Sequence, residues 1–240
     1  MHQTNSFFKG IKDGLPICFG YLSVAFAFGI FSVESGLSLW QALVISMTNV
    51  TSAGQLAAVP IIMAGGSLWE LALSQLVINM RYALMSVSLS QKLGTTITAF
   101  DRFVISFMNT DEVFAVSSSN KGRVERSYMY GLILTPFLGW SIGTFAGAGA
   151  GNILPAAITS ALGIAIYAMF VAIVIPEASN RKPTAMLVMF AVALSCIFYF
   201  VPVLNKIQSG FVIIICASVA SLVFALLCPI EIKEEAAKNE

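Results

Sequence analysis

The chain has 240 residues, of which 58% are hydrophobic and 10% are charged, and its formal net charge is +1. A soluble domain usually carries roughly 25% charged residues, so this composition excludes a water-soluble globular protein, and the near-neutral charge gives no electrostatic footprint for nucleic acid. Apolar runs of about 20 residues recur along nearly the whole chain, whereas the short alternating segments of an outer-membrane barrel are absent. We therefore predict an all-α integral membrane protein.

The apolar runs predict a polytopic helical bundle of about eight spans, or seven if the fourth run does not cross. In chain order the predicted spans are 14–33, 39–63, 67–90, 102–120, 127–148, 155–176, 184–201 and 209–227. Residues 1–230 are expected to form one membrane-embedded transport domain, and residues 231–240 a charged cytoplasmic tail.

The placement of lysine and arginine predicts the orientation of the spans. With eight crossings, one side carries Lys9, Lys12, Lys121, Arg123, Arg126, Arg181, Lys182, Lys233 and Lys238, and the other carries Lys92, Arg102 and Lys206. Cytoplasmic loops are enriched in these residues, so both termini are expected in the cytoplasm. With seven crossings, the basic loop at Arg181 and Lys182 would lie on the wrong side.

The third run contains Arg81, a charge that costs about 2.5–3.5 kcal/mol at a membrane-helix centre on insertion scales. One helical stripe of the same run collects four polar residues, Gln75, Asn79, Tyr82 and Ser86. Arg81 falls on roughly the opposite side, and a helix that is polar on two sides is expected to be central to the bundle. Arg81 either binds a substrate carboxylate or closes a structural ion pair with Asp111 or Glu112.

Polar residues also interrupt the second and fourth runs. Non-helical backbone at membrane depth survives only where it lines a cavity or is buried in protein, so the second run is either a broken helix or a continuous one. Its candidate transport residues are Asn49, Thr51, Ser52, Gly54 and Gln55. The fourth run is either a buried helix or a re-entrant segment. There Asp111 and Glu112 are candidates for proton coupling, since burial raises the pKa of a carboxylate, or else they lie at a helix end near water.

Glycine and cysteine positions favour structural roles. Gly139, Gly143, Gly147 and Gly151 are spaced by four, which lets two membrane helices approach closely and favours packing over a gate. The cysteines lie in or at the end of apolar runs without a close pair, and the only histidine is His2. We therefore predict no disulfide, metal site or cofactor.

Several motifs, taken in order, resemble the AzlC family, the large subunit of bacterial branched-chain amino acid exporters. They are Gly14-Leu15-Pro16, Glu34-Ser35-Gly36-Leu37-Ser38, Ser52-Ala53-Gly54-Gln55, Asn79-Met80-Arg81-Tyr82 and Thr110-Asp111-Glu112. The resemblance covers about residues 8–227. It implies efflux of leucine, isoleucine, valine and sometimes methionine, coupling to the proton gradient, and a small membrane partner of the AzlD type. Leu56 and Tyr82 depart from the family, which usually has an aromatic residue and often a histidine there.

The sequence therefore favours a proton-coupled permease of the bacterial inner membrane that exports branched-chain amino acids. Its candidate substrate-binding residues are the five of the second run with Gln75, Asn79, Arg81 and Tyr82. Alternatives are a permease for another small organic solute or ion, and a structural subunit of a transport complex. An enzyme is disfavoured because the chain has no histidine cluster, no Gly-x-Ser-x-Gly elbow and no Asp-rich phosphate motif.

Overall fold

The computed structural model describes residues 6–120, 122–151, 155, 171, 174–176 and 178–228. Apart from one isolated bridge, regular secondary structure in these residues is helical, which confirms the predicted all-α class. The chain divides into two compact units, Met1–Phe170 and Val171–Glu240, each described by itself. The tail 231–240 and most of the predicted sixth span, 155–176, lie outside the described residues.

The helices of the first unit are α1 (Phe7–Glu34), α2 (Leu39–Thr48), α3 (Ser52–Met63), α4 (Leu68–Lys92), α5 (Ala99–Phe107), α6 (Asp111–Ser119) and α7 (Arg126–Gly151). The second unit contains α9 (Lys182–Phe200), a short 3-10 helix (Leu204–Lys206) and α10 (Ser209–Leu227), and the rings of Phe190 and Phe224 join its two long helices. Within the described residues, α1, α7, α9 and α10 are long and apolar enough to cross a membrane.

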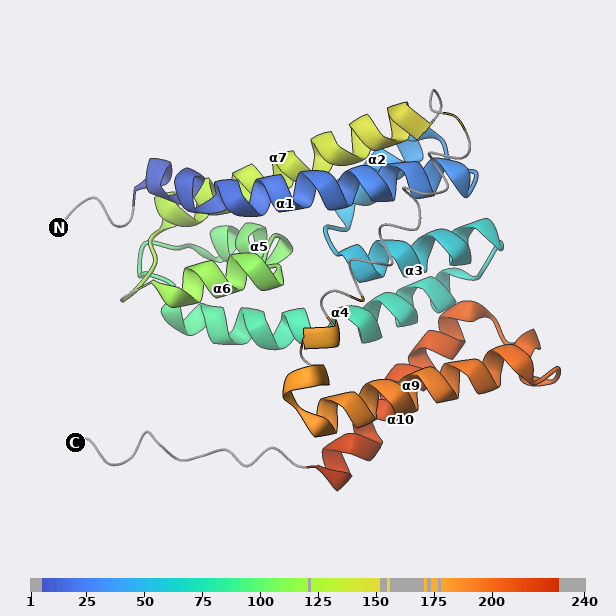
Figure 1. Ribbon diagram of the computed structural model, residues 1–240. Helices are drawn as coiled ribbons and strands as arrows, with labels where there is room; N and C mark the ends of the chain where they lie inside the picture. Colours follow the sequence, from blue (N-terminus) through green and yellow to red (C-terminus); the bar gives the residue numbers. More distant parts are fainter. Residues whose placement is uncertain are drawn as a thin grey trace. The chain divides into compact units, whose positions relative to one another are not determined.

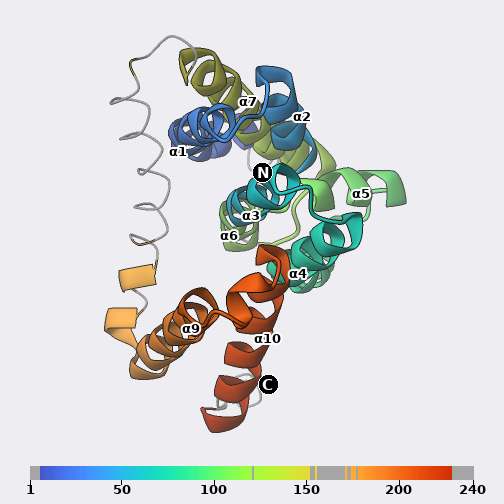
Figure 2. The ribbon, with the colours of Figure 1, turned by 90° about the vertical axis from the view of Figure 1, so that its right-hand side faces the viewer.

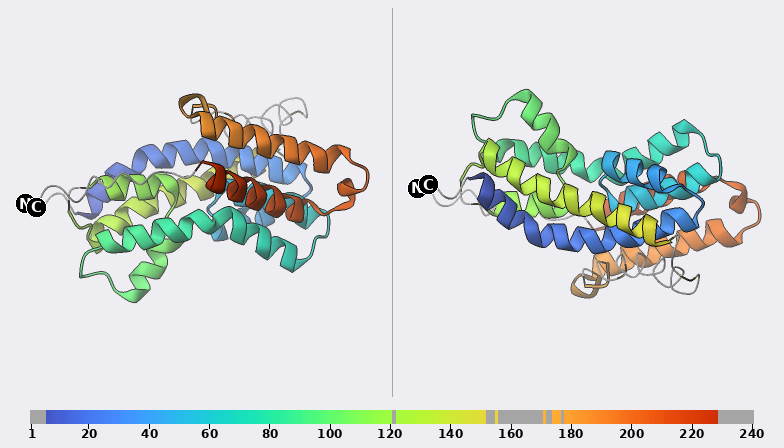
Figure 3. Two further views of the ribbon diagram at one scale, coloured as in Figure 1. Left: turned by 90° about the horizontal axis from the view of Figure 1, so that it is seen from below. Right: turned by 90° about the horizontal axis from the view of Figure 1, so that it is seen from above.

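Helices α1 and α7 lie side by side and run in the same direction, as Figure 3 shows. Glycine residues of both helices lie at the contact between α1 and α7, here called the glycine seam. A Cβ atom on Gly139 would meet the backbone of Cys18, and one on Gly147 would meet the backbone of Phe26. The close approach of backbones confirms the packing role predicted for the glycine series, with α1 as the partner helix.

Helices α2 and α3 form a re-entrant hairpin (Figure 1). The helix stops after Thr48, because Asn49 adopts a non-helical backbone conformation. The Thr51 hydroxyl donates to Asn49 Oδ1 over 2.8 Å within this break. Met63, at the end of α3, lies against Gly36 in the loop that precedes α2, so the chain returns to the end of the unit from which it entered. The second predicted span is therefore broken rather than continuous.

Helices α5 and α6 form a second re-entrant hairpin at the opposite end of the unit (Figure 1). The backbone N–H of Val124 donates to Lys92 O, and Arg126 pairs with Asp101, so the segments before and after the hairpin lie together. The count of eight crossings placed Lys92 and Arg102 opposite the loop at 121–126. The structure corrects this placement, because the chain turns back at Met108–Thr110.

The two hairpins belong to two structural repeats. A long helix, α1 or α4, precedes each hairpin, and the two long helices run in opposite directions. Corresponding polar residues recur at an offset of 60 residues: Ser38 and Thr98, Gln41 and Asp101, Ser46 and Ser106, Asn49 and Asn109. Inverted repeats of this kind are common in secondary transporters, where broken helices meet near the midplane.

Candidate functional site

The two hairpin tips meet on the middle of α4. Figure 2, which looks along the helices, shows α3 and α6 between α1 and α4, in agreement with the contacts among these four helices. α3 begins at Ser52 and α6 at Asp111, and from the middle of the unit they run toward opposite ends. The positive ends of two helix dipoles therefore converge at this level.

Neutral hydrogen bonds hold the first tip to α4. Gln75 Nε2 donates to the carbonyl of Gly54 over 2.9 Å. Gln75 Oε1 accepts from Asn49 Nδ2 at 3.1 Å and from Asn79 Nδ2 at 3.2 Å. With the bond between Thr51 and Asn49, these contacts connect five of the nine predicted substrate-binding residues into one network.

An ion pair holds the second tip to α4. Arg81 Nη2 lies 2.8 Å from Asp111 Oδ2, and the two side chains are 55% and 42% exposed. Tyr82 lies beside this pair: Arg81 Nη2 also donates to its hydroxyl over 3.2 Å, and Arg81 Cζ lies 4.9 Å from the centre of its ring. The structure contains the ion pair that was one of the two alternatives for Arg81, and both partners are partly exposed.

Two further contacts at the second tip were not part of the predicted site. The hydroxyl of Tyr21, on α1, donates to Glu112 Oε2 over 2.5 Å, and the Tyr21 ring packs edge-on against Trp140. Asn109 Nδ2 donates to Ser86 Oγ over 3.0 Å. A lone tyrosine in an apolar span gives no sequence signal, whereas Asn109 could have been found from its spacing of 60 residues from Asn49.

Not every predicted residue faces α4. Gln55 is fully buried and turns the other way, because its Nε2 donates to Ser46 Oγ over 2.8 Å, and Ser46 in turn contacts Thr144 of α7 at 2.6 Å. Ser52 is half-buried at the first position of α3. Gln55 therefore braces the hairpin against the α1–α7 pair.

The two helix starts differ in their electrostatics. Thr51 makes no side-chain capping bond to α3, whose first turn contains no acidic residue. At α6, Thr110 accepts from the N–H of Val113, and Asp111 and Glu112 occupy the first turn. The N–H groups at the start of α3 can therefore receive an external anion, whereas α6 supplies its own negative charge.

Buried acceptor oxygens complete the candidate site. Among the described residues, the amide oxygens of Asn79 and Asn109 at the tips are buried and have no hydrogen-bond partner, as is that of Gln55 on the side away from α4. Such atoms need a donor, which a ligand N–H or a water can supply. No group of three or more metal-ligating side chains occurs in the described part of the chain.

Comparison with known proteins identifies similar sequences. The AzlC protein family model matches residues 16–154, which include both hairpins. The chain is 28% identical over 228 residues to the inner membrane protein YgaZ of Escherichia coli, covering 92% of this chain and 91% of that protein. It is 32% identical over 197 residues to an uncharacterized membrane protein of Archaeoglobus fulgidus, covering 81% and 86%. No solved structure matches the chain.

Proposed function

Since this chain belongs to the AzlC family, we propose that it exports leucine, isoleucine and valine, and also methionine, across the bacterial inner membrane in exchange for protons. The family and its membrane relatives support a membrane transporter rather than an enzyme. The substrate, the direction, the proton coupling and a small AzlD-type partner are the proposal, and the resemblance to amino acid exporters supports them.

The observation that carries the proposal is the pairing of opposite binding chemistries at one level of α4. Arg81 and the uncapped start of α3 suit a carboxylate. Asp111 and Glu112, at the second tip with Arg81, suit an ammonium group. The buried oxygen of Asn79, on the face of α4 that meets the first tip, is a further acceptor. A free amino acid carries both charges, whereas a simple anion or cation would leave half of these groups unused.

The ion pair between Arg81 and Asp111 links binding to protons. A substrate carboxylate takes the place of Asp111 on Arg81, and the Asp111 carboxylate then binds the substrate ammonium group. A proton that Asp111 takes up from the outside removes this negative charge, so the substrate is released there. Asp111 gives the proton to the cytoplasm before the next substrate binds, so a proton enters for each amino acid that leaves. The hairpins enter from opposite ends, so alternate opening of one tip and then the other exposes the site to each side in turn.

Charge at the two ends of the first unit supports cytoplasmic termini. The end where α1 and α7 begin carries Lys9, Lys12, Lys92, Arg102, Arg123 and Arg126. The loops at the other end, residues 35–38 and 64–67, contain no lysine or arginine. Two of the eight predicted spans, the second and the fourth, turn back instead of crossing. The remaining six predicted crossings are an even number, which keeps both termini on the same side.

Counterflow into liposomes tests the substrate. The full chain, reconstituted with and without its small partner and loaded with unlabelled leucine, should accumulate labelled leucine, isoleucine and valine. Two leucine analogues test recognition of both charges: 4-methylpentanoate lacks the ammonium group and isoamylamine lacks the carboxylate. Neither should compete. Competition by 4-methylpentanoate as strong as by leucine would instead identify an organic-anion permease.

A further inference from the structure

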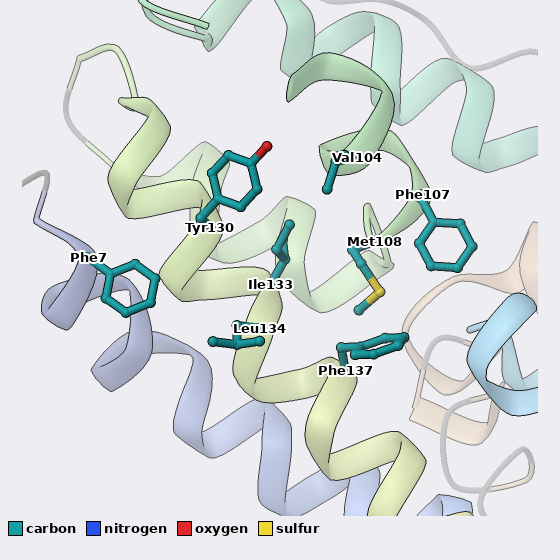
Figure 4. A pocket seen from close by; sticks show the side chains of 8 residues that line it. All are labelled: Phe7, Val104, Phe107, Met108, Tyr130, Ile133, Leu134 and Phe137. Atoms are coloured by element: carbon teal, nitrogen blue, oxygen red, sulfur yellow. The ribbon is translucent and has the colours of Figure 1, made fainter. Parts of the chain in front are cut away.

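An apolar pocket of 280 Å³ lies between α5 and α7 and extends to Met108 in the break of the second hairpin. Figure 4 shows Phe7 and Tyr130 at one end and Met108 and Phe137 at the other. Along α7 the lining extends from Tyr130 to Phe137, which at 1.5 Å per helical residue is roughly 10 Å. None of the proposed substrate-binding residues lines this pocket.

A fixed cation stands at the end of the pocket nearest the start of α7. Arg126 Nε forms an ion pair with Asp101 Oδ1 at 2.9 Å, and its guanidinium lies 5.7 Å from the ring centre of Tyr130. Asp101 is fully buried and also accepts from the Tyr130 hydroxyl at 2.8 Å. Because a buried carboxylate orients Arg126 while 54% of its side chain stays exposed, the guanidinium is a preorganised anion-binding group.

We propose that this pocket binds one acyl chain of an anionic phospholipid whose phosphate contacts Arg126. Charge complementarity supports this occupant, because the apolar pocket continues inward from the end of the unit that carries the basic residues. A phospholipid has the same order of groups along the membrane normal. A methylene group occupies about the volume of a water molecule, roughly 30 Å³, so the pocket accommodates part of one chain.

The headgroup, rather than the chain, selects this lipid. An acyl chain gains little by moving from the bilayer into an equally apolar pocket, because lipid tails already surround it. The contact between phosphate and Arg126 is charge-assisted and favours anionic over zwitterionic headgroups. The pocket fixes where the lipid lies, and Arg126 determines which lipid it is.

Bound lipid would also brace the second hairpin. Met108, at the inner end of the pocket, is the C-cap residue of α5 and precedes Asn109 in the break. The outer face of α5 leaves Phe100, Phe103 and Phe107 exposed. A lipid chain against Met108 therefore stabilises the break from the side opposite α4. The inference does not depend on which substrate is transported.

Thermal unfolding of the purified full chain in detergent tests the proposal. We would add dioleoyl phosphatidylglycerol, dioleoyl phosphatidylcholine or glycerol phosphate and measure the melting temperature and, by native mass spectrometry, the lipid retained. Phosphatidylglycerol should bind at least tenfold more tightly than phosphatidylcholine. Arg126→Gln should remove this preference, whereas Lys12→Gln, at the same end of the unit, should keep it. The difference between the two lipids is taken within each variant, so a loss of stability does not affect the comparison.

A matched pair of substitutions tests the pocket itself. Leu134 lines the pocket and Leu138 follows one turn later without lining it, and the two are 40% and 45% exposed. Leu134→Trp should reduce lipid retention several-fold and Leu138→Trp should leave it unchanged. Equal retention of the two lipids by the wild type, equal behaviour of the two tryptophan variants, or an equal shift with glycerol phosphate would overturn the proposal. Displacement of the lipid by the small membrane partner, with crosslinking at position 134, would assign the pocket to that partner instead.

Discussion

Hairpins α2–α3 and α5–α6 begin with the same capping device and break at corresponding asparagines, yet they are held to α4 by different chemistry. Gln75 and Asn79 hold the first tip through amide hydrogen bonds. Arg81 holds the second through an ion pair with Asp111. Amide bonds do not depend on pH or on a competing ion, whereas an ion pair can be opened by a second carboxylate or by a proton. The proposed transport cycle therefore assigns the response to substrate and protons to the second tip.

Loss of the arginine should have the largest effect. Arg81→Ala removes the group proposed to bind the substrate carboxylate, and a hydrogen bond to a charged group contributes about 1.5–3 kcal/mol. We expect branched-chain amino acid export to fall by roughly 10-fold to 100-fold. Arg81→Lys keeps the charge but loses the two-pronged geometry, so it should retain part of the activity. Export from loaded vesicles, normalised to protein level, measures both.

Asp111→Asn separates the two roles of the pair. If Asp111 exchanges between Arg81 and the substrate ammonium group, this variant should still bind leucine, because no carboxylate competes for Arg81, and should lose the response of transport to a pH gradient. If the pair is only structural, Asp111→Asn and Arg81→Ala should lower the melting temperature and leave the pH response of the remaining transport unchanged. Leucine binding and gradient-driven transport by Asp111→Asn therefore distinguish an exchanging pair from a structural one.

At the neutral tip, Gln75→Leu should mainly destabilise. The substitution leaves the amide groups of Asn49 and Asn79 without their acceptor and the carbonyl of Gly54 without its donor. A buried group left unpaired costs about 1–3 kcal/mol, so we expect a lower melting temperature at every pH. Leu76→Met, at the exposed neighbouring position, is the control and should change stability by no more than about 0.5 kcal/mol. A pH-dependent loss in Gln75→Leu would contradict the assignment of a purely neutral tip.

A smaller effect is expected at Gly54, where the first tip packs against α4. A Cβ atom at Gly54 would lie 2.5 Å from Gln75 Oε1 and 3.3 Å from Asn79 Nδ2. Gly54→Ala should therefore cost about 1–3 kcal/mol by overpacking, less up to about 1 kcal/mol gained in helix propensity. Gly20→Ala, where a Cβ would have no atom within 4 Å, should gain only the propensity. Equal melting temperatures for the two variants would show that the first tip is loosely packed.

The sequence allowed prediction of the helical membrane class, the polar residues of α4 and the glycine seam, because composition and spacing are local signals. The return of the chain in each hairpin could not be predicted. In sequence, a break flanked by two apolar halves has the same pattern as one membrane crossing. Only the contacts of Met63 with Gly36 and of Arg126 with Asp101 show that the chain returns to the end from which it entered. The few charged residues within the apolar runs left Asp111 and Glu112 as alternative ion-pair partners for Arg81, and in the structure the partner is Asp111.

The position of α4 shows a further limit of sequence reading. A helix that is polar on two sides was expected to be central. In the structure it bonds to both hairpins, while Leu76, Met80 and Leu84 are exposed. Tyr21 shows the opposite case, because it reaches Glu112 only through the packing of α1 against the hairpin. Neither arrangement follows from helical periodicity, since both depend on contacts between segments far apart in the chain.

The smallest expected effect lies at the starts of the hairpins, which differ in one ionisable group. Ser38 and Gln41 form a neutral capping box at α2, whereas Thr98 and Asp101 form an acidic one at α5, in the connection outside the spanning helices. The hydrogen bond from the backbone N–H of Thr98 holds the pKa of Asp101 below its ordinary value of 3.8.

A carboxyl group whose pKa is lowered by folding contributes stability that is present above its unfolded pKa and is lost as the pH falls through the folded one. We therefore expect the melting temperature to fall as the pH drops below about 3.8, and Asp101→Asn should remove this part of the acid sensitivity. Gln41→Asn, at the neutral box, should leave it unchanged. Equal acid sensitivity in the wild type and Asp101→Asn would place the acid-labile group elsewhere.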